Sequence, residues 1–269
     1  MKIIFSKKKL IKALDNEENL GFVPTMGALH DGHKYLIKKS MQNNKKTIVS
    51  IFVNKQQFNK KDDYSSYPRV FKKDKKILKE LNVDYVFIPN EKDIYPEKII
   101  KKIKINSFKK KLCGKFRPNH FEAVVDVVSR FIKIINPKRI YLGKKDMQQL
   151  MLIYDYLKKK KFNTEVVACK TVRQKNGMAY SSRNLHLNYK NQAVGSKIYK
   201  LLLKQKRKII LKKISLRHIK SEIIKFGVEK IEYLNILDLN KLIKPHKKKM
   251  NKKIFIAYYI NSVRLIDNI

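Results

Sequence analysis

The sequence predicts an α/β protein with a Rossmann-like, doubly wound parallel sheet, followed by a smaller α+β unit. Short apolar segments of strand length alternate with amphipathic segments of helical period through about residue 172. Polar residues gather directly after several of these strands, where ligands of such sheets bind. After residue 184 the pattern changes to lysine-rich helical segments and two β-like runs. Alternating strands and helices are typical of parallel strands joined by right-handed crossovers.

The first strand and helix enclose a short loop. An apolar run at residues 20–23 stops at Pro24, a Gly-containing loop follows, and apolar residues return at helical spacing from His33. The further elements that we expect, in chain order, are strands at 47–53, 84–88, 139–142 and 164–168 and helices at 69–81, 120–135 and 146–157.

The rest of the chain predicts a second unit. Residues 192–226 have helical spacing, and residues 230–237 and 253–260 are β-like. We therefore expect a ligand-binding Rossmann-like domain at 1–172 and a small C-terminal α+β domain at 173–269 that acts as a lid. No low-complexity linker separates the two.

Composition points to a globular protein of the cytoplasm. The 269 residues are 43% hydrophobic, enough for a sizeable core. No apolar run is long enough for a signal peptide or a membrane span, so no membrane partner is expected. Cys113 and Cys169 stand far apart without a C-x-x-C partner, which predicts reduced thiols and neither a disulfide nor a zinc site.

The net charge of +42 raises the alternative of a nucleic-acid-binding protein. Only nine of the 64 basic residues are Arg, and the lysines are spread along the chain instead of alternating with aromatic residues in one patch. We interpret the excess as compositional drift and expect no specific nucleic-acid partner. The lysine runs at 158–161 and 247–249 are interpreted as solvated helix ends and loops.

Two histidines mark the candidate site. His30 and His33 flank Gly32 at the start of a predicted helix, three positions apart, so both rings can face one side. Free backbone N–H groups and the helix dipole favour phosphate there, and imidazoles add proton donors that titrate near neutral pH. The alternative is a pair of surface histidines at a loop. Neither G-x-G-x-x-G nor a P-loop motif occurs.

The segment from Pro24 to His33, PTMGALHDGH, closely resembles the nucleotide-binding signature of the pantothenate synthetase (pantoate–β-alanine ligase) family, within the H-x-G-H nucleotidyltransferases. Further blocks agree in order over nearly the whole chain: SIFVN at 50–54 with QF at 57–58, YPR at 67–69, LCG at 112–114, RP at 117–118 with HF at 120–121, Gly143 with KD at 145–146 and QQ at 148–149, SSRN at 181–184, and RLIDNI at 264–269.

The resemblance implies that ATP adenylates pantoate with loss of pyrophosphate, after which β-alanine attacks the pantoyl adenylate to give pantothenate and AMP. It also implies Mg²⁺ and a homodimer. His33 matches the general acid of the family, and His30 and Lys145 would join it on the phosphates. Implied nucleotide-binding residues are Met26, Gly27, Ala28, Leu29, His30, Asp31, Gly32, His33, Gly143, Lys144, Lys145, Asp146, Val172, Tyr180, Ser181, Ser182 and Arg183, and implied pantoate-binding residues are Gln57 and Gln149.

Within these roles, Gly143 lets the backbone approach the nucleotide and Asp146 accepts from the ribose hydroxyls. Val172 and Tyr180 border the adenine. Residues 181–183 form a mobile loop that grips phosphate, for which two hydroxyls and a planar guanidinium are suited.

Plainer interpretations stand beside several of these roles. Met26 and Val172 are residues of core type, and Gln148 is by default solvated on its helix. Arg117 and His120 form either a structural clasp or a substrate contact. The aspartates at 62–63 could bind metal, but in a lysine-rich loop they are expected to pair with lysines, and we assign no metal ligand.

Five positions depart from the family pattern without removing a group that the reaction needs: Lys55 for proline, Lys144 for Glu, Asn119 for Gly, Asn176 for an acidic residue and Tyr180 for Met. Two other functions remain open: a nucleotidyltransferase of the same fold that retains the adenylyl product, and the nucleic-acid-binding protein.

Overall fold

The main sheet has six parallel strands, as the sequence predicts. The structure is a computed structural model that describes residues 1–96, 103–239 and 252–269. The strands lie in the order β1-β4-β3-β2-β5-β6, and every pair is parallel. Their bounds are β1 (Lys2–Ile4), β2 (Leu20–Thr25), β3 (Lys46–Ile51), β4 (Tyr85–Phe87), β5 (Arg139–Gly143) and β6 (Glu165–Cys169).

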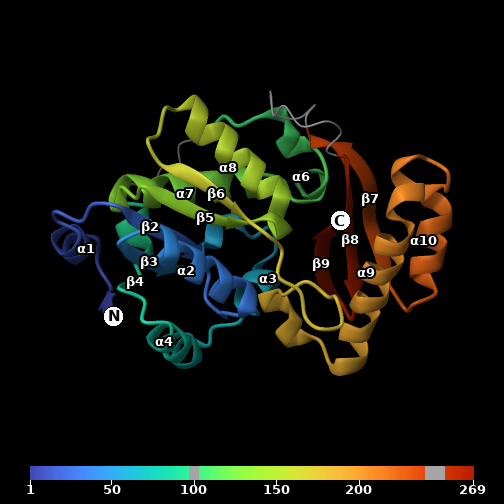
Figure 1. Cartoon of the computed structure of the whole chain (residues 1–269), viewed down its shortest axis with the longest axis horizontal. Coiled ribbons are helices and arrows are strands. Elements are labelled where there is room, and N and C mark those ends of the chain that lie inside the picture. The colour runs from blue at the N-terminus through green and yellow to red at the C-terminus, as the bar shows by residue number, and fades with distance from the viewer. Residues whose placement is uncertain (97–102, 240–251) are drawn as a thin grey trace.

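Helices cover both faces of this sheet (Figure 1). Phe22 of β2 joins a core with residues of α7 and α8, whereas the next residue, Val23, joins a core with residues of α2 and α4. Alternate side chains of a strand point to opposite faces, so this split shows a sheet buried on both sides. The helices of this part are α1 (Lys7–Ala13), α2 (Asp31–Asn43), α3 (Lys61–Ser65), α4 (Phe71–Glu80), α5 (Glu91–Ile94), α6 (Cys113–Phe116), α7 (His120–Ile135) and α8 (Met147–Lys159).

A second sheet is antiparallel, with the order β7-β8-β9. Its strands are β7 (Lys230–Asp238), β8 (Lys252–Ile260) and β9 (Val263–Asn268), and α9 (Tyr189–Ile210) and α10 (Leu216–Ile224) pack on it (Figure 1). Its other face meets the first part of the chain, because Tyr233 and Phe255 belong to the same buried cluster as α7 and α8.

Most sequence-predicted elements are confirmed, with differences at short ones. α7 begins and ends at the residues expected, 120 and 135. The short β1 and α1, and the last strand β9, were not expected, and β2 continues through Pro24 to Thr25. Residues 158–161 are exposed at the end of α8, as expected of a solvated run, whereas 247–249 lie outside the described residues.

The sheet opens between β2 and β5. β5 pairs only with Gly21 and Phe22 of β2, so β3 is the only strand that pairs with β2 at Pro24. A proline, which has no N–H to donate, is tolerated where a neighbouring strand is missing. The chain proceeds outward from β2 through β3 in one direction and from β5 to β6 in the other, which makes this gap the switch point where ligands of doubly wound sheets bind.

Candidate active site

A cavity of about 290 Å³ lies at this switch point. Its walls come from the ends of β2 and β5, from the loop after β6, from α7 and from the second sheet. Of the residues that the family resemblance implies, the cavity is lined by Met26, His30, Gly32, His33, Gln57, Gly143, Lys145, Asp146, Gln149, Val172, Tyr180, Ser181, Ser182 and Arg183. Gly27, Ala28, Leu29, Asp31 and Lys144 do not line it.

The loop after β2 is held by a buried carboxylate that the sequence analysis missed. Gly27 and Ala28 have φ values of 80° and 50°. Asp74 of α4, which is 1% exposed, accepts from the N–H groups of Ala28 at 2.9 Å and Leu29 at 2.8 Å. These two bonds stabilise the left-handed conformation at Ala28, which a residue with a Cβ rarely adopts. The signal in the sequence is an acidic residue on the apolar face of α4, beside Ile77 and Leu78.

The two histidines close the first turn of α2. His30 is the N-cap, and its Nδ1 accepts from the N–H of Gly32 at 3.1 Å, while Nδ1 of His33 accepts from the N–H of His30 at 3.3 Å. A Cβ at Gly32 would lie 2.8 Å from the His30 ring, so only glycine permits this approach. The rings stack with centroids 4.0 Å apart. Because both Nδ1 atoms accept, each neutral ring carries its proton on Nε2.

Burial keeps both rings neutral, which differs from the near-neutral titration expected from sequence. Desolvation, reinforced by the Lys145 ammonium, lowers the pKa of His30 to about 4. Desolvation also holds the pKa of His33 well below its usual value, and the neighbouring His30 acts in the same direction. At pH 7 the pair therefore offers two neutral N–H donors beside Lys145.

Lys145 lies in the short 3₁₀ segment Lys144–Asp146 that joins β5 to α8. Its ammonium is 3.6 Å from the Asp146 carboxylate. A Cβ at Gly143 would meet no atom within 4 Å, so the glycine leaves open space in the cavity wall, whereas its φ of −78° is accessible to any residue. The role of Gly143 toward the nucleotide stays a prediction. Lys144 is exposed and does not line the cavity.

The loop at 181–183 packs against the β2 loop. The Ser182 hydroxyl donates to the carbonyl of Ala28 at 3.1 Å. The rings of Tyr180 and His30 stack with their centroids 6.0 Å apart, and the Tyr180 hydroxyl is hydrogen-bonded to Asp31. Arg183 forms an ion pair with both oxygens of Asp63 at 2.9 Å, so Asp63 pairs with an arginine and not with a lysine as expected.

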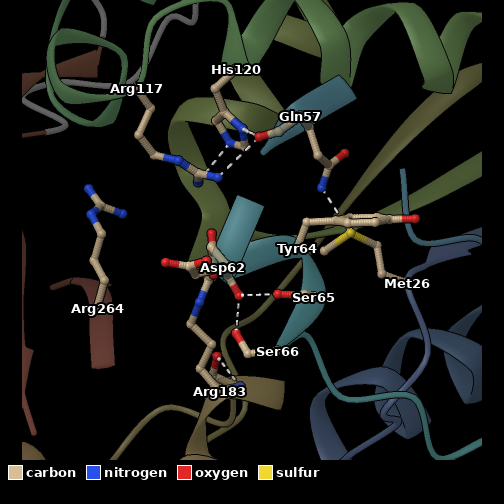
Figure 2. A network of polar contacts seen from close by, with 12 residues as sticks. Met26, Gln57, Asp62, Tyr64, Ser65, Ser66, Arg117, His120, Arg183 and Arg264 are labelled. Carbon is tan, nitrogen blue, oxygen red and sulfur yellow. Dashed lines mark hydrogen bonds and ion pairs between the residues drawn. The ribbon is translucent and has the colours of Figure 1, made fainter. Parts of the chain in front are cut away.

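Arg117 and His120 clasp the backbone at Gln57 (Figure 2). Nδ1 of His120 donates to the Gln57 carbonyl at 2.8 Å, and Nη2 of Arg117 donates to the same oxygen at 3.2 Å. Nε2 of His120 accepts from Nη1 of Arg117 at 3.0 Å, which fits the neutral ring that burial favours. The clasp interpretation is therefore confirmed, and both side chains also line the cavity. Burial and two nearby arginines lower the pKa of Arg117 to about 10.

The side chain of Gln57 is held only weakly. Its amide donates to the sulfur of Met26 at 2.9 Å (Figure 2), and a thioether is a poor acceptor. A carboxylate or hydroxyl oxygen of a ligand would be a better partner. Met26 thus contributes to the cavity wall instead of the core.

The adjacent glutamines of α8 have different roles. Gln149 is partly exposed and lines the cavity. Gln148 also reaches the wall but is 5% exposed: its amide accepts from the N–H of Cys113 and donates to the carbonyls of Phe108 and Lys111. The expectation that Gln148 is solvated is wrong, because it ties α8 to the segment before α7.

The described residues contain no cluster of three or more His, Cys, Asp or Glu side chains arranged to hold a metal ion. In the same residues no helix is long and apolar enough to cross a bilayer. Cys113 and Cys169 are buried free thiols, as expected.

A cavity that contains a histidine pair at a helix N-terminus, at the switch point of a doubly wound sheet, defines an enzyme of the nucleotide-using α/β class. The family model described as pantoate-beta-alanine ligase matches residues 2–269. The chain belongs to this family and has pantoate–β-alanine ligase activity, which produces pantothenate.

Individual relatives agree over nearly full length. Pantothenate synthetase of Clostridium botulinum is 39% identical, with 94% of this chain and 92% of the relative covered. That of a Sulfurihydrogenibium strain is 40% identical with the same coverage. A crystal structure of the Francisella tularensis ligase, complexed with β-alanine and an ATP-type ligand, has a TM-score of 0.87 at 39% identity and covers 100% of this chain and 97% of that chain. The Thermus thermophilus enzyme has a TM-score of 0.88 at 32% identity, with 100% and 99% covered.

Proposed function

We propose that the cavity between β2 and β5 performs both half-reactions of the ligase, with a pantoyl adenylate held between them. A pantoate carboxylate oxygen attacks the α-phosphorus of ATP and pyrophosphate leaves. The β-alanine amine then attacks the acyl carbon of the adenylate, AMP leaves, and the amine loses a proton. The observation that carries this proposal is that one cavity is lined by cationic Lys145, by the two imidazoles and by the uncharged amides of Gln57 and Gln149.

Lys145, His30 and His33 would stabilise the phosphates as negative charge grows on the transition state and on leaving pyrophosphate. The two rings present Nε2–H groups, because backbone N–H groups occupy their Nδ1 atoms. ATP brings several negative charges close to these rings, and an adjacent anion raises the pKa of an imidazole. His33 would thereby gain the proton that it needs as the acid of this step.

The remaining nucleotide contacts follow from the cavity wall. Gly143 leaves room for the nucleotide, Asp146 would accept from the ribose hydroxyls, and Val172 and Tyr180 would border the adenine. Ser181, Ser182 and Arg183 would grip phosphate. Met26 and Gly32 lie on the wall, whereas Gly27, Ala28, Leu29, Asp31 and Lys144 would act by shaping the loops around it.

Gln57 and Gln149 would bind pantoate through its hydroxyls and carboxylate. An amide orients a carboxylate without the strong charge stabilisation that would reduce its nucleophilicity. Gln57 is suited to this exchange because its amide nitrogen donates to a weak acceptor, the Met26 sulfur, and its amide oxygen accepts only a long bond of 3.5 Å from Asn54.

Mg²⁺ would enter as MgATP. This ion is usually bound through substrate phosphates, waters and one or two carboxylates, and does not need a cage of protein ligands. The absence of a three-ligand cluster among the described side chains is compatible with this mode of binding.

We further infer a homodimer in the cytoplasm, by family precedent and because ATP is the energy source. Residues 1–172 would supply most nucleotide and pantoate contacts, and residues 173–269 would cover them as a lid domain. We assign no specific nucleic-acid partner to the spread-out lysines.

Isotope exchange between pyrophosphate and ATP tests the adenylate. Exchange should require pantoate but not β-alanine, and AMP release should require both. His33→Ala should reduce exchange by about two to four orders of magnitude. His218→Ala is the matched control, because His218 is exposed on α10. Exchange that depends on β-alanine would overturn the adenylate route, and wild-type exchange in the His33 variant would remove His33 from it.

A further inference from the structure

We propose that Asn268 of β9 is a positioning residue for Lys145, through which the antiparallel sheet fixes the phosphate-binding loop. The inference rests on the phosphate role proposed for Lys145. Asn268 belongs to the RLIDNI block at 264–269, which has no role in the reaction as proposed above.

The contact between β9 and the lysine loop is specific. The Asn268 amide nitrogen donates to the carbonyls of Lys144 and Lys145, each at 2.8 Å. Asn268 is 4% exposed, so water does not compete for these bonds. Two consecutive carbonyls bound to one planar amide define the path of the backbone from which the Lys145 side chain departs.

Within the described residues, few other contacts hold the interior of this loop. The 3₁₀ segment Lys144–Asp146 begins at Gly143 without a side-chain cap. Gly143 pairs with Cys169 of β6, which fixes the start of the loop but not the carbonyls of Lys144 and Lys145. The ammonium of Lys145 is 3.6 Å from Asp146, which belongs to the same loop and does not tie it to another element. Asn268, 123 residues away in sequence, provides that tie.

β9 is a firm support for this contact. Asn268 pairs with Phe255 of β8, and Ile269 exchanges both backbone hydrogen bonds with Ile254. The preceding residue, Asp267, forms a two-contact ion pair with Arg173 at 2.6 and 2.9 Å. Arg173 also lies 3.9 Å over the ring of Tyr199 in α9. The same strand therefore holds both the lysine loop and the segment that leads to residues 181–183.

The side-chain amide of Asn268 donates hydrogen bonds through its nitrogen but accepts none through its oxygen within the described residues. The oxygen of Asn268 is buried and has no hydrogen-bond partner among the described residues. Leaving a buried oxygen unpaired is costly, so the two donated bonds decide the orientation of the side chain. Asn268→Asp keeps the shape but replaces both donors with an oxygen that faces two carbonyl oxygens.

A double-mutant cycle on ATP affinity, measured by titration calorimetry with MgATP, tests the inference. Asn268→Asp and Asn268→Ala are each made in the wild-type chain and in Lys145→Ala. Asn235→Asp is the matched control, since it makes the same chemical change at an exposed position of the same sheet. Pantoate affinity and thermal melting are measured on every variant.

We expect each Asn268 variant to weaken ATP binding about tenfold in the wild-type chain and less than twofold in Lys145→Ala, because residues that act through one another are not additive. Pantoate affinity should change less than twofold. Asn268→Ala introduces no charge and keeps the test valid if Asn268→Asp does not fold.

Two results would overturn the inference: unchanged ATP affinity in the folded Asn268→Ala protein, or the same loss in both backgrounds. If Lys145→Ala alone leaves ATP binding and pyrophosphate exchange intact, the phosphate role of Lys145 is wrong as well. That outcome is separate, because it is read from the single Lys145 variant.

Discussion

His30 makes stability depend on pH, and His30→Asn isolates the effect. The pKa of His30 is about 4 in the folded chain, where burial is the main cause, and about 6.5 in an unfolded chain. Between these values the unfolded state binds more protons, so stability is present above pH 6.5 and is lost as the pH falls. Asparagine also caps helices but does not titrate.

The magnitude follows from the gap between the two pKa values. Each pH unit below 6.5 costs about 1.4 kcal/mol, so the wild-type chain should lose about 2 kcal/mol between pH 7 and pH 5 that His30→Asn does not lose. Urea unfolding at both pH values measures the difference. Titrating groups that do not interact with His30 cancel between the two proteins, and burial, the larger cause of the lowered His33 pKa, acts in both.

The exposed residue His218 provides the control, since His218→Asn should follow the wild-type chain at both pH values. Parallel curves for wild type and His30→Asn would refute the reasoning, because they would mean that the ring gains its proton as readily in the folded chain as in the unfolded one.

Three further results are expected. Gln149→Ala should remove about 1–3 kcal/mol of pantoate binding and raise the pantoate KM accordingly. Gln148→Ala should lower the urea midpoint and leave that KM nearly unchanged, because Gln148 accepts from the N–H of Cys113 and donates to two backbone carbonyls. Steady-state kinetics and urea unfolding separate the two effects. Asp74→Ala should cost about 2–4 kcal/mol in urea unfolding, since it leaves two buried N–H groups without a partner. Glu222→Ala, which breaks a more exposed pair with Lys225, should leave the urea midpoint nearly unchanged; equal losses would contradict the loop assignment. The charge of +42 should speed encounter with anionic ATP, so kcat/KM should fall gradually with salt while kcat stays flat, and duplex DNA should be released by the same modest salt; DNA binding that survives physiological salt would favour a nucleic-acid role.

The sequence predicted those parts of the fold whose signal is local. α7 has a long apolar period, and its bounds were correct. The turn from β2 into α2 is marked by Pro24, glycines and histidines within ten residues. β1 is only three residues long and has no period to detect.

The parts of the site that were missed depend on distant partners. Asp74 lies 46 residues from Ala28, and Asp63 lies 120 residues from Arg183. Nothing near either aspartate in sequence indicates a backbone N–H or an arginine as its partner. Gln148 and Gln149 are chemically identical, and the turn of α8 toward the core decides which of them is buried.

The ion pair between Arg183 and Asp63 would make any phosphate that binds Arg183 compete with a carboxylate. A phosphate that takes the guanidinium must first displace a carboxylate held at 2.9 Å through both oxygens. If Arg183 binds ATP as proposed, the net gain in binding free energy is the attraction of Arg183 to the phosphate minus its attraction to the Asp63 carboxylate. Asp63 would then reclaim the arginine when pyrophosphate departs, which would favour release of a product whose charge would otherwise hold it in the site. On this proposal, the ion pair weakens the binding of ATP and speeds turnover.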